Sequence, residues 1–417
     1  MRSNYKKLGR FIKDISIKNK ELDVDLLLGV SITKRFIPSI ANIVGTDMSK
    51  YKIVKRHQFA YGSVTSRNGE KISVALLEEE KCIVSTSYTV FEIVNTEQLD
   101  PEYLMMWFRR SEFDRYARYM SHGTVRELFG WEEMCDVELP VPPIGKQREI
   151  VREYNVVNDR ILLNEQFTQK LEYTAQGIYK QWFVDFEFPI TKEYAESIGK
   201  PELENKPYKS SGGEMEYCEI LDKDIPLSWR IVQLGDIGDV VTGKTPSSTL
   251  DGCFGNEILF ITPTDYKNYT KCAIGSIRKL SDVGKKALRN KILPPKSLLV
   301  TCIGSDMGKV AVNFEPCVTN QQINALLPKA YNQTEFLYYL FDHMYYHLRN
   351  IAIGSSTMPM INKSEFEMIE ILYPTSGVLS KFEVRVSVFT IKLQQIKRQS
   401  DLLKSLRTLL LQKITEA

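Results

Sequence analysis

The chain has 417 residues, of which 43% are hydrophobic and 26% charged, and its formal net charge is +3. This length exceeds what one hydrophobic core usually holds, so we expect two or three domains. No apolar run reaches the length of a membrane span, and Met1 leads into Lys and Arg rather than an apolar leader. The seven cysteines are scattered without a C-x-x-C pair, which favours reduced thiols over disulfides or zinc. We therefore expect a cytoplasmic protein that does not bind a membrane.

The distribution of charge says more than its sum. Residues 1–71 hold 15 Lys or Arg and 6 Asp or Glu, whereas residues 72–143 hold 6 and 14. Residues 262–313 are basic again, with 10 and 3. Such basic stretches could follow a phosphate backbone, although an ordinary solvated surface explains them equally well.

The first 142 residues predict a β-rich domain that carries one helix. The helix over residues 101–120 opens with Asp100 as N-cap and Pro101 at its first position. A loop and a short strand that ends at Pro142 follow it. The strands expected before the helix, from their β-rich composition and the turn signals between them, are 26–32, 51–61, 71–77 and 81–93.

Residues 143–182 predict one long helix with an apolar seam. Hydrophobic residues recur in steps of four and three, the spacing of a coiled coil, and the other faces are charged. Two polar residues, Asn164 and Thr168, occupy seam positions, where a buried polar side chain can fix the register of two helices. The seam residues are Ile150, Tyr154, Val157, Ile161, Leu171 and Ile178.

The C-terminal residues 376–417 repeat this spacing, interrupted by Ser400 and Arg407. Two helices of matched length and period favour packing against each other, with independent amphipathic helices in separate domains as the simpler alternative. The seam residues here are Leu379, Phe382, Val386, Phe389, Leu393 and Ile396. Between the two helices, the acidic residues 183–225 predict a linker, and residues 226–375 predict a second domain with strands, a helix over 333–350 and a strand ending at Pro374.

The two halves of the chain form an internal repeat. Leu8-Gly9 corresponds to Leu234-Gly235, and Glu102-Tyr103-Leu104 corresponds to Glu335-Phe336-Leu337. The intervals stay close to one value along the chain, so the repeat is a duplicated domain rather than a solenoid.

Three motifs that could carry catalysis fail on their context. Residues 238–245 match the Walker A pattern that ends in Lys244, but Pro246 follows directly and no helix can start there. His343 and His347 lie one helical turn apart without the glutamate that a zinc peptidase needs. The alternating carboxylates Asp185 and Glu187 fit the polar edge of an extended strand. We expect no catalytic residue and no metal site.

Several short motifs together resemble the specificity subunit of type I restriction–modification systems. They cover residues 139–150, with Pro142-Pro143, Gln147 and Ile150, and residues 182–189, which read WFVDFEFP. Residues 225–237 and the TGKTP of residues 242–246 continue the resemblance. Residues 373–377 depart from it, because they lack the Pro-Pro pair found before the first long helix.

The resemblance implies an α+β chain with two similar mixed α/β target recognition domains, separated by a long antiparallel two-helix coiled coil and related by a pseudo-twofold axis. The expected boundaries are domain 1 at 1–142, helix 1 at 143–182, linker at 183–225, domain 2 at 226–375 and helix 2 at 376–417. The paired helices would act as a ruler between two unlike half-sites in double-stranded DNA. It also implies partners, namely two modification subunits that use S-adenosylmethionine and restriction subunits that use ATP and Mg; no cofactor is expected in this chain.

The candidate DNA contacts are polar and basic loop residues, each of which could equally be solvated surface. They are Lys34, Arg35, Arg56, Arg67, Asn68, Lys71, Thr124 and Arg126 in the first repeat, and Lys244, Thr245, Tyr266, Lys267, Ser305, Asn320, Gln321, Gln322 and Thr357 in the second. Two other functions remain as alternatives, a coiled-coil scaffold without DNA specificity and a P-loop NTPase built on Lys244.

Overall fold

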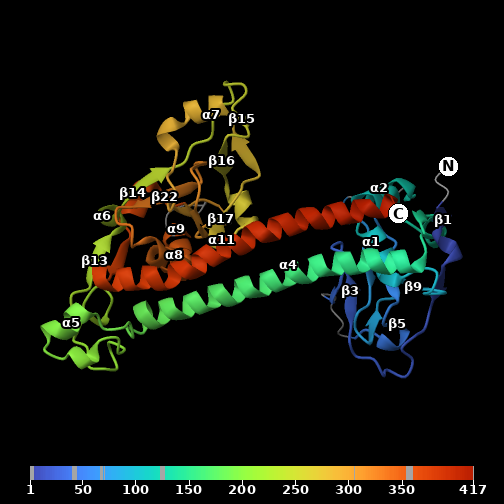
Figure 1. Ribbon diagram of the computed structural model, residues 1–417, viewed down its shortest axis with the longest axis horizontal. Helices are drawn as coiled ribbons and strands as arrows, with labels where there is room; N and C mark the ends of the chain where they lie inside the picture. Colours follow the sequence, from blue (N-terminus) through green and yellow to red (C-terminus); the bar gives the residue numbers. More distant parts are fainter. Residues whose placement is uncertain are drawn as a thin grey trace. The chain divides into compact units, whose positions relative to one another are not determined.

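The computed structural model describes residues 4–39, 45–65, 69, 71–122, 127–304, 306–353 and 360–416 (Figure 1). It divides into two compact units. Unit 1 comprises Met1–Leu163 and Asp401–Ala417, and unit 2 comprises Asn164–Ser400. Each long helix therefore contributes one segment to each unit, instead of standing apart from the domains.

Unit 1 is built on short antiparallel strands. Its main sheet has the order β2-β9-β6-β7, and β1 pairs with β10, β3 with β4 and β5 with β8. The predicted strand 51–61 is two strands, because His57 between them has a positive φ of 65° that turns the chain. The strands are β1 (Tyr5–Lys7), β2 (Ile12–Ile15), β3 (Leu28–Val30), β4 (Phe36–Pro38), β5 (Lys52–Lys55), β6 (Phe59–Gly62), β7 (Val74–Leu76), β8 (Lys81–Val84), β9 (Tyr88–Ile93) and β10 (Glu138–Pro140).

The helices of unit 1 are α1 (Pro101–Phe108), α2 (Ser111–Met120) and α3 (Trp131–Cys135). Asp100 caps α1 as predicted, because its carboxylate accepts the N–H groups of Glu102 and Tyr103. The single helix predicted over 101–120 is wrong: Arg110 adopts an extended backbone with ψ of 141° and places its guanidinium 4.4 Å from the Trp107 ring.

Two long-helix segments complete unit 1. Ile150 and Tyr154 of α4 (Ile144–Tyr179) join the core of the domain together with Ile414, which follows α11 (Ser376–Lys413). Lys413 pairs with Glu153 at 3.4 Å, and Arg407 donates to Asn158 Oδ1 at 3.4 Å. Residue numbers increase along α4 while those of the partner residues on α11 decrease, so the two segments are antiparallel in this unit.

Unit 2 contains two larger sheets, with the orders β14-β22-β19-β20-β17 and β15-β18-β16-β21. β13 pairs with β23, and β11 with β12. The strands are β11 (Met215–Cys218), β12 (Lys223–Pro226), β13 (Arg230–Gln233), β14 (Gly238–Thr242), β15 (Phe254–Gly255), β16 (Ile258–Ile261), β17 (Cys272–Ala273), β18 (Arg278–Leu280), β19 (Leu298–Thr301), β20 (Val310–Asn313), β21 (Cys317–Thr319), β22 (Ile323–Pro328) and β23 (Glu370–Tyr373).

The helices of unit 2 include two that replace one predicted helix. The helix expected over 333–350 is divided at Met344 into α8 (Thr334–His343) and α9 (Tyr345–Ile353). The remaining short helices are α5 (Lys192–Ser197), α6 (Leu234–Ile237), α7 (Asp282–Ala287) and α10 (Lys363–Glu367).

Residues 183–225 are folded rather than a free linker. The chain leaves α4 through a π-helical turn at Lys180–Val184, so the extended strand expected around Asp185 does not form. Phe183, Phe188 and Tyr208 are buried in the main core of unit 2, and Phe188 stacks on Trp229 with ring centroids 5.2 Å apart. Aromatic burial therefore holds this acidic segment against the second domain.

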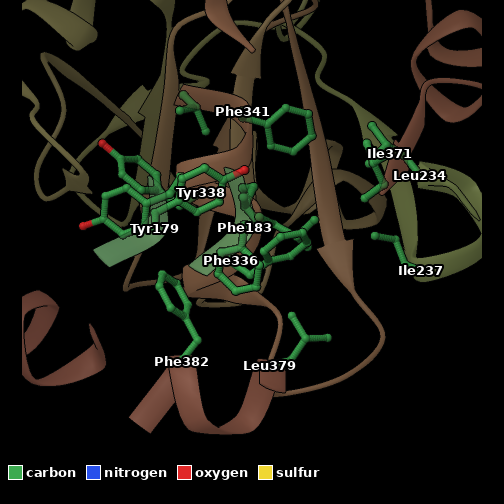
Figure 2. Close-up of a cluster of buried hydrophobic side chains, with 14 of the residues drawn as sticks. Tyr179, Phe183, Leu234, Ile237, Phe336, Tyr338, Phe341, Ile371, Leu379 and Phe382 are labelled. Atoms are coloured by element: carbon green, nitrogen blue, oxygen red, sulfur yellow. The ribbon is translucent and has the colours of Figure 1, made fainter. Parts of the chain in front are cut away.

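The α4 and α11 segments of unit 2 meet through the same aromatic core. Phe183 lies 4.8 Å from both Phe336 of α8 and Phe382 of α11, measured between ring centroids, and Figure 2 shows these side chains together. Further along, Asn164 Nδ2 donates to Ser400 Oγ at 3.1 Å. Two polar interruptions of the seam thus face each other.

The seam positions agree with this pairing. Leu171, Ile178 and Phe389 are partly buried. The other nine are buried, namely Ile150, Tyr154, Val157, Ile161, Leu379, Phe382, Val386, Leu393 and Ile396. The internal repeat is also visible, because α3 followed by β10 in unit 1 corresponds to α10 followed by β23 in unit 2. In the described part of the chain no helix is long and apolar enough to cross a membrane.

Replacing Phe382 by alanine tests the aromatic core of unit 2. The side chain is fully buried, so Phe382→Ala should lower the free energy of unfolding by about 3–5 kcal/mol in urea titrations. The matched control is Val388→Ala on the exposed side of α11, where 62% of the residue is accessible; it should change stability by less than about 0.5 kcal/mol. Equal losses in the two variants would contradict the packing.

Candidate nucleic-acid interface

Three loops of the second domain gather where their strands end. β16 and β21 are parallel, with Ile261 opposite Thr319, so the chain leaves both at the same edge of the sheet. β14 ends at Thr242 opposite Asn324, which brings the loop after β14 to the start of β22. We call residues 243–245, 262–268 and 319–322 the loop cluster.

Hydrogen bonds hold the loop cluster together. The Lys244 N–H donates to the Thr319 carbonyl at 2.8 Å, and the Asn320 N–H donates to the Ile261 carbonyl at 3.1 Å. Thr245 Oγ1 donates to Gln321 Oε1 at 2.8 Å. Gly243 permits the approach, because a Cβ there would lie 2.2 Å from the Asn320 carbonyl oxygen.

The structure therefore brings together five predicted contacts. Asn320 and Gln322 also bond to each other, through Asn320 Nδ2 and Gln322 Oε1 at 2.9 Å. Lys244 and Gln321 are exposed, and Lys267 is exposed on the 3-10 turn Pro263–Asn268. The five are Lys244, Thr245, Asn320, Gln321 and Gln322. Asn320 is 8% exposed and bonds to Gln322, so it supports the edge, which presents the Lys244 cation and the amides of Gln321 and Gln322.

Tyr266 is corrected by the structure. It is 7% exposed, and its hydroxyl donates to the Leu299 carbonyl at 2.8 Å, so it has no free group for a nucleic acid. Burial, as the main cause, raises the pKa of this phenol well above its usual value. Ser305 and Thr357 lie outside the described residues.

The sequence missed exposed basic residues beside the domain's second sheet. Lys285 and Lys286 lie in the last turn of α7, and Arg289 follows it. Ser281 caps this helix by accepting the Gly284 N–H at 3.2 Å. In the sequence, only the basic composition of residues 262–313 indicated these residues, and composition does not distinguish one lysine from another.

In unit 1, Lys34 is also corrected, because it is a buried structural residue. It is 6% exposed, and its Nζ donates to Asp114 Oδ1 and to the Ile72 carbonyl, each at 2.6 Å. Burial outweighs the carboxylate and lowers the pKa of this ammonium group. The hydrogen bond from Lys34 to the Ile72 carbonyl holds the turn that carries Arg35 against the backbone next to Lys71. Arg35 and Lys71 are both exposed.

Arg56 lies away from that pair. It precedes β6, whereas Lys71 precedes β7, and these strands are antiparallel with Phe59 opposite Leu76. The two residues therefore occupy opposite ends of the β6–β7 hairpin. The other predicted contacts of this unit, Arg67, Asn68, Thr124 and Arg126, fall outside the described residues.

A buried ionic contact attaches the second domain to α11. Lys271 is fully buried and pairs with Glu335 at the start of α8. Thr390 Oγ1 of α11 donates to Glu335 Oε2 at 3.0 Å, and Glu383 Oε2 accepts the Glu335 N–H at 3.0 Å. Burial, as the main cause, raises the pKa of the Glu383 carboxyl.

Unit 1 has a similar attachment to α4. Asn155 Nδ2 donates to Glu102 Oε2 at 2.5 Å, and Gln147 Oε1 accepts the Asp100 N–H at 2.9 Å. Glu102 and Glu335 occupy equivalent positions in the sequence repeat. This equivalence could have indicated that both bond to a long helix. Thus α1 and α8 are each hydrogen-bonded to the long helix that follows their own domain.

The rejected motifs do not form sites in the structure. Gly238–Thr242 is the strand β14, and no helix begins at Lys244. His343 and His347 are exposed and belong to different helices. Among the described residues, no group of three or more His, Cys, Asp or Glu side chains could hold a metal.

Comparisons with known proteins agree with this architecture. Residues 226–378 match the family model for the type I restriction modification DNA specificity domain. Over 390 residues, 84% of each chain, the sequence is 27% identical to the type I restriction enzyme HindI specificity subunit of Haemophilus influenzae. It is 32% identical over 196 residues to the MjaIX specificity subunit of Methanocaldococcus jannaschii, which covers 46% of this chain and 45% of that protein.

The fold points the same way. The crystal structure of the type I restriction–modification S subunit from M. genitalium superposes with a TM-score of 0.60 at 13% identity, covering 99% of this chain and 95% of the other. Residues 226–378 carry the type I DNA specificity domain, and the chain is similar along most of its length to type I specificity subunits. The resemblance seen in the short motifs is confirmed, and the mixed α/β fold with a long helix between sheet-rich regions is the expected one.

Removing one partner of the buried ionic contact should be costly. Lys271→Met leaves the Glu335 carboxylate buried without its cation, so we expect a loss of about 3–5 kcal/mol in the free energy of unfolding. The double variant Lys271→Met with Glu335→Leu should recover much of this loss, because neither charge is then buried. Lys363→Met is the control, since its pair with Glu367 is exposed and should contribute under about 1 kcal/mol. Equal stability of Lys271→Met and the control would contradict the role of the contact.

Proposed function

We propose that this chain is the sequence-specific DNA-binding subunit of a type I restriction–modification complex. It would recognise a bipartite, asymmetric site and direct adenine methylation or cleavage by partner subunits. The loop cluster is the observation that carries the proposal. Side chains suited to base edges lie there at one edge of a sheet, on backbone fixed by hydrogen bonds, which is the preorganisation that selective recognition requires.

The two repeats support two unlike half-sites. The second domain offers the amides of Gln321 and Gln322, whereas the described candidates that remain in the first domain are Arg35, Arg56 and Lys71. Amide side chains suit the donor and acceptor pair of adenine, and arginine suits guanine. Domains with different readers predict a target that is not a palindrome.

Base reading and backbone binding fall to different residues in this proposal. Lys244, Lys267 and the basic end of α7 would contact phosphates, which fixes the orientation of the protein without selecting sequence. The amides of the loop cluster would select bases. The chain itself would be non-catalytic and would function in the cytoplasm.

We infer the partner surfaces from exposed apolar residues on the long helices. On α4 they include Val156 and Phe167, at 69% and 41% exposure, and on α11 Val384 and Val388, at 73% and 62%. Exposed apolar residues of this size on a polar helix favour protein contacts. We assign these faces to two modification subunits, which would bind S-adenosylmethionine; restriction subunits would bind ATP and Mg.

The two alternative functions have less support. A scaffold without DNA specificity gives no reason for a preorganised edge of amides and lysines. A P-loop NTPase needs a helix after Lys244, where the chain continues as a loop.

Mapping methylated adenines tests the proposed function. In cells that express this chain with its modification subunits, methylation should occur at one asymmetric sequence with two specified parts and an unspecified spacer. Omitting this chain is the control and should abolish the methylation. Methylation that is absent, or that is indifferent to sequence when the chain is present, would contradict the proposal.

Two variants separate base reading from phosphate contact. Gln321→Ala should relax the preference at one position of the target, by about 1–3 kcal/mol of discrimination. Lys285→Ala should weaken binding to all sequences alike and lower the slope of log affinity against log salt by about 1. Fluorescence anisotropy of the assembled complex on target and single-substitution duplexes measures both. The same uniform loss in both variants would contradict base reading by Gln321.

A further inference from the structure

An arginine that the sequence did not single out lies at the start of β18, next to the loop cluster. Arg278 is paired with Phe260 of β16, one residue before the strand ends at Ile261. The Ile261 carbonyl accepts the Asn320 N–H of the loop cluster at 3.1 Å. The backbone of Arg278 therefore lies at the same end of the sheet as the loop cluster.

A buried carboxylate ties this backbone to the loop cluster. Asp265, in the turn that follows β16, is 1% exposed. Its Oδ1 accepts the Ile277 N–H at 2.7 Å, and its Oδ2 accepts the N–H and the hydroxyl of Thr262, each at 2.8 Å. The Ser276 hydroxyl also donates to the Arg278 carbonyl at 2.6 Å. The start of β18 is therefore held in one position relative to the turn that carries Lys267.

Two aromatic rings orient the Arg278 side chain. Its guanidinium carbon lies 4.6 Å from the ring centroid of Phe254 on β15 and 5.4 Å from that of Phe260. Phe260 is fully buried, Phe254 is 43% exposed, and the two rings meet edge to face with centroids 5.6 Å apart. A guanidinium stacked in this way keeps its plane oriented, so it loses less freedom when it binds a ligand.

The Arg278 guanidinium has no polar partner of its own. Arg278 is exposed, and its side chain forms no hydrogen bond or ion pair with any described residue. Stacking alone also fits an arginine whose stem covers apolar rings. An oriented fork of N–H donors that is left unpaired at the edge of the loop cluster favours recognition of a planar pair of acceptors.

The surroundings favour a polyanion over a single small anion. Lys285, Lys286 and Arg289 are exposed at the end of α7, which lies beside β15 (Figure 1) and contacts β18. Lys267 is exposed on the other side, in the turn after β16. Among the described residues none of these four side chains forms an ion pair. Several unpaired cations on one domain suit successive phosphates of a nucleic acid.

We propose that Arg278 is a base-reading residue of the second domain and recognises guanine. Its fork donates to the O6 and N7 acceptors of that base in the major groove, while the neighbouring cations bind phosphates. Phe254 is a positioning residue, because it orients the guanidinium without touching the base. This inference rests on the proposed DNA function and deepens it by naming one base that the domain selects.

Fluorescence anisotropy of the assembled complex tests it, on the target found by methylation mapping and on duplexes with one base pair substituted. The parent should discriminate against replacement of one G·C pair, and Arg278→Ala should lose this discrimination by about tenfold to a hundredfold at that pair alone. Arg278→Lys keeps the charge without the planar fork, so it should recover affinity for all duplexes but only part of the discrimination. Phe254→Leu removes the ring and should reduce discrimination at the same pair by about twofold to fivefold.

The matched control is Arg289→Ala, which removes an exposed arginine after α7 and should weaken binding to all duplexes alike. Circular dichroism verifies that each variant is folded; if Arg278→Ala is unfolded, Arg278→Lys and Phe254→Leu supply the test. Unchanged discrimination at every pair in Arg278→Ala, or an equal loss on all duplexes, would overturn this inference while the selectivity of the parent still supports the proposed function. A parent without any sequence preference would contradict both.

Discussion

The pairing of α4 with α11 is the constraint on which both units depend. An apolar seam alone permits several registers, because one leucine or isoleucine layer substitutes for another at small cost. The polar contacts select among them. In unit 2 Asn164 meets Ser400, and in unit 1 Asn158 meets Arg407. Shifting either helix by a heptad would separate both pairs and leave the buried Asn164 and Ser400 against apolar seam residues.

Each recognition domain is then fixed to a long helix by hydrogen bonds and not by apolar packing alone. Glu335 is the centre of the contact in unit 2, because it joins Lys271 from the domain to Thr390 and Glu383 on α11. A buried ionic group contributes little to stability compared with an apolar replacement, but it tolerates only one geometry. A domain that must present its loops to DNA in one orientation benefits from such a contact.

Much of this architecture could be predicted from the sequence, because it follows from periodicity. The seam and the Asp100 cap depend on local spacing along the chain. In the sequence, Asn164 already interrupts the seam of the first long helix and Ser400 that of the second. The break at Arg110 could not be predicted, because it depends on stacking against Trp107. The folding of residues 183–225 was missed for the same reason: their acidic composition resembles a linker, while Phe188 and Tyr208 find partners only in three dimensions.

The candidate contacts divide in the same way. Lys34 and Tyr266 have the residue types of DNA-binding loops, and only their burial shows that they support the loops instead. Lys244 and Gln321 were identified by type, but the hydrogen bonds that place them side by side join segments about 75 residues apart in the chain. Sequence alone thus gives the chemistry of the site and leaves its assembly open.

Disulfide trapping across the helix pair tests the central claim most directly. Asn164→Cys with Ser400→Cys should form a cross-link under mild oxidation, because the native side chains are 3.1 Å apart. Leu171→Cys with Ser400→Cys, displaced by about 10 Å along α4, should not. Peptide mapping by mass spectrometry that finds the first cross-link and lacks the second would support the pairing and its register. Free thiols in the first variant, or equal cross-linking in both, would contradict it.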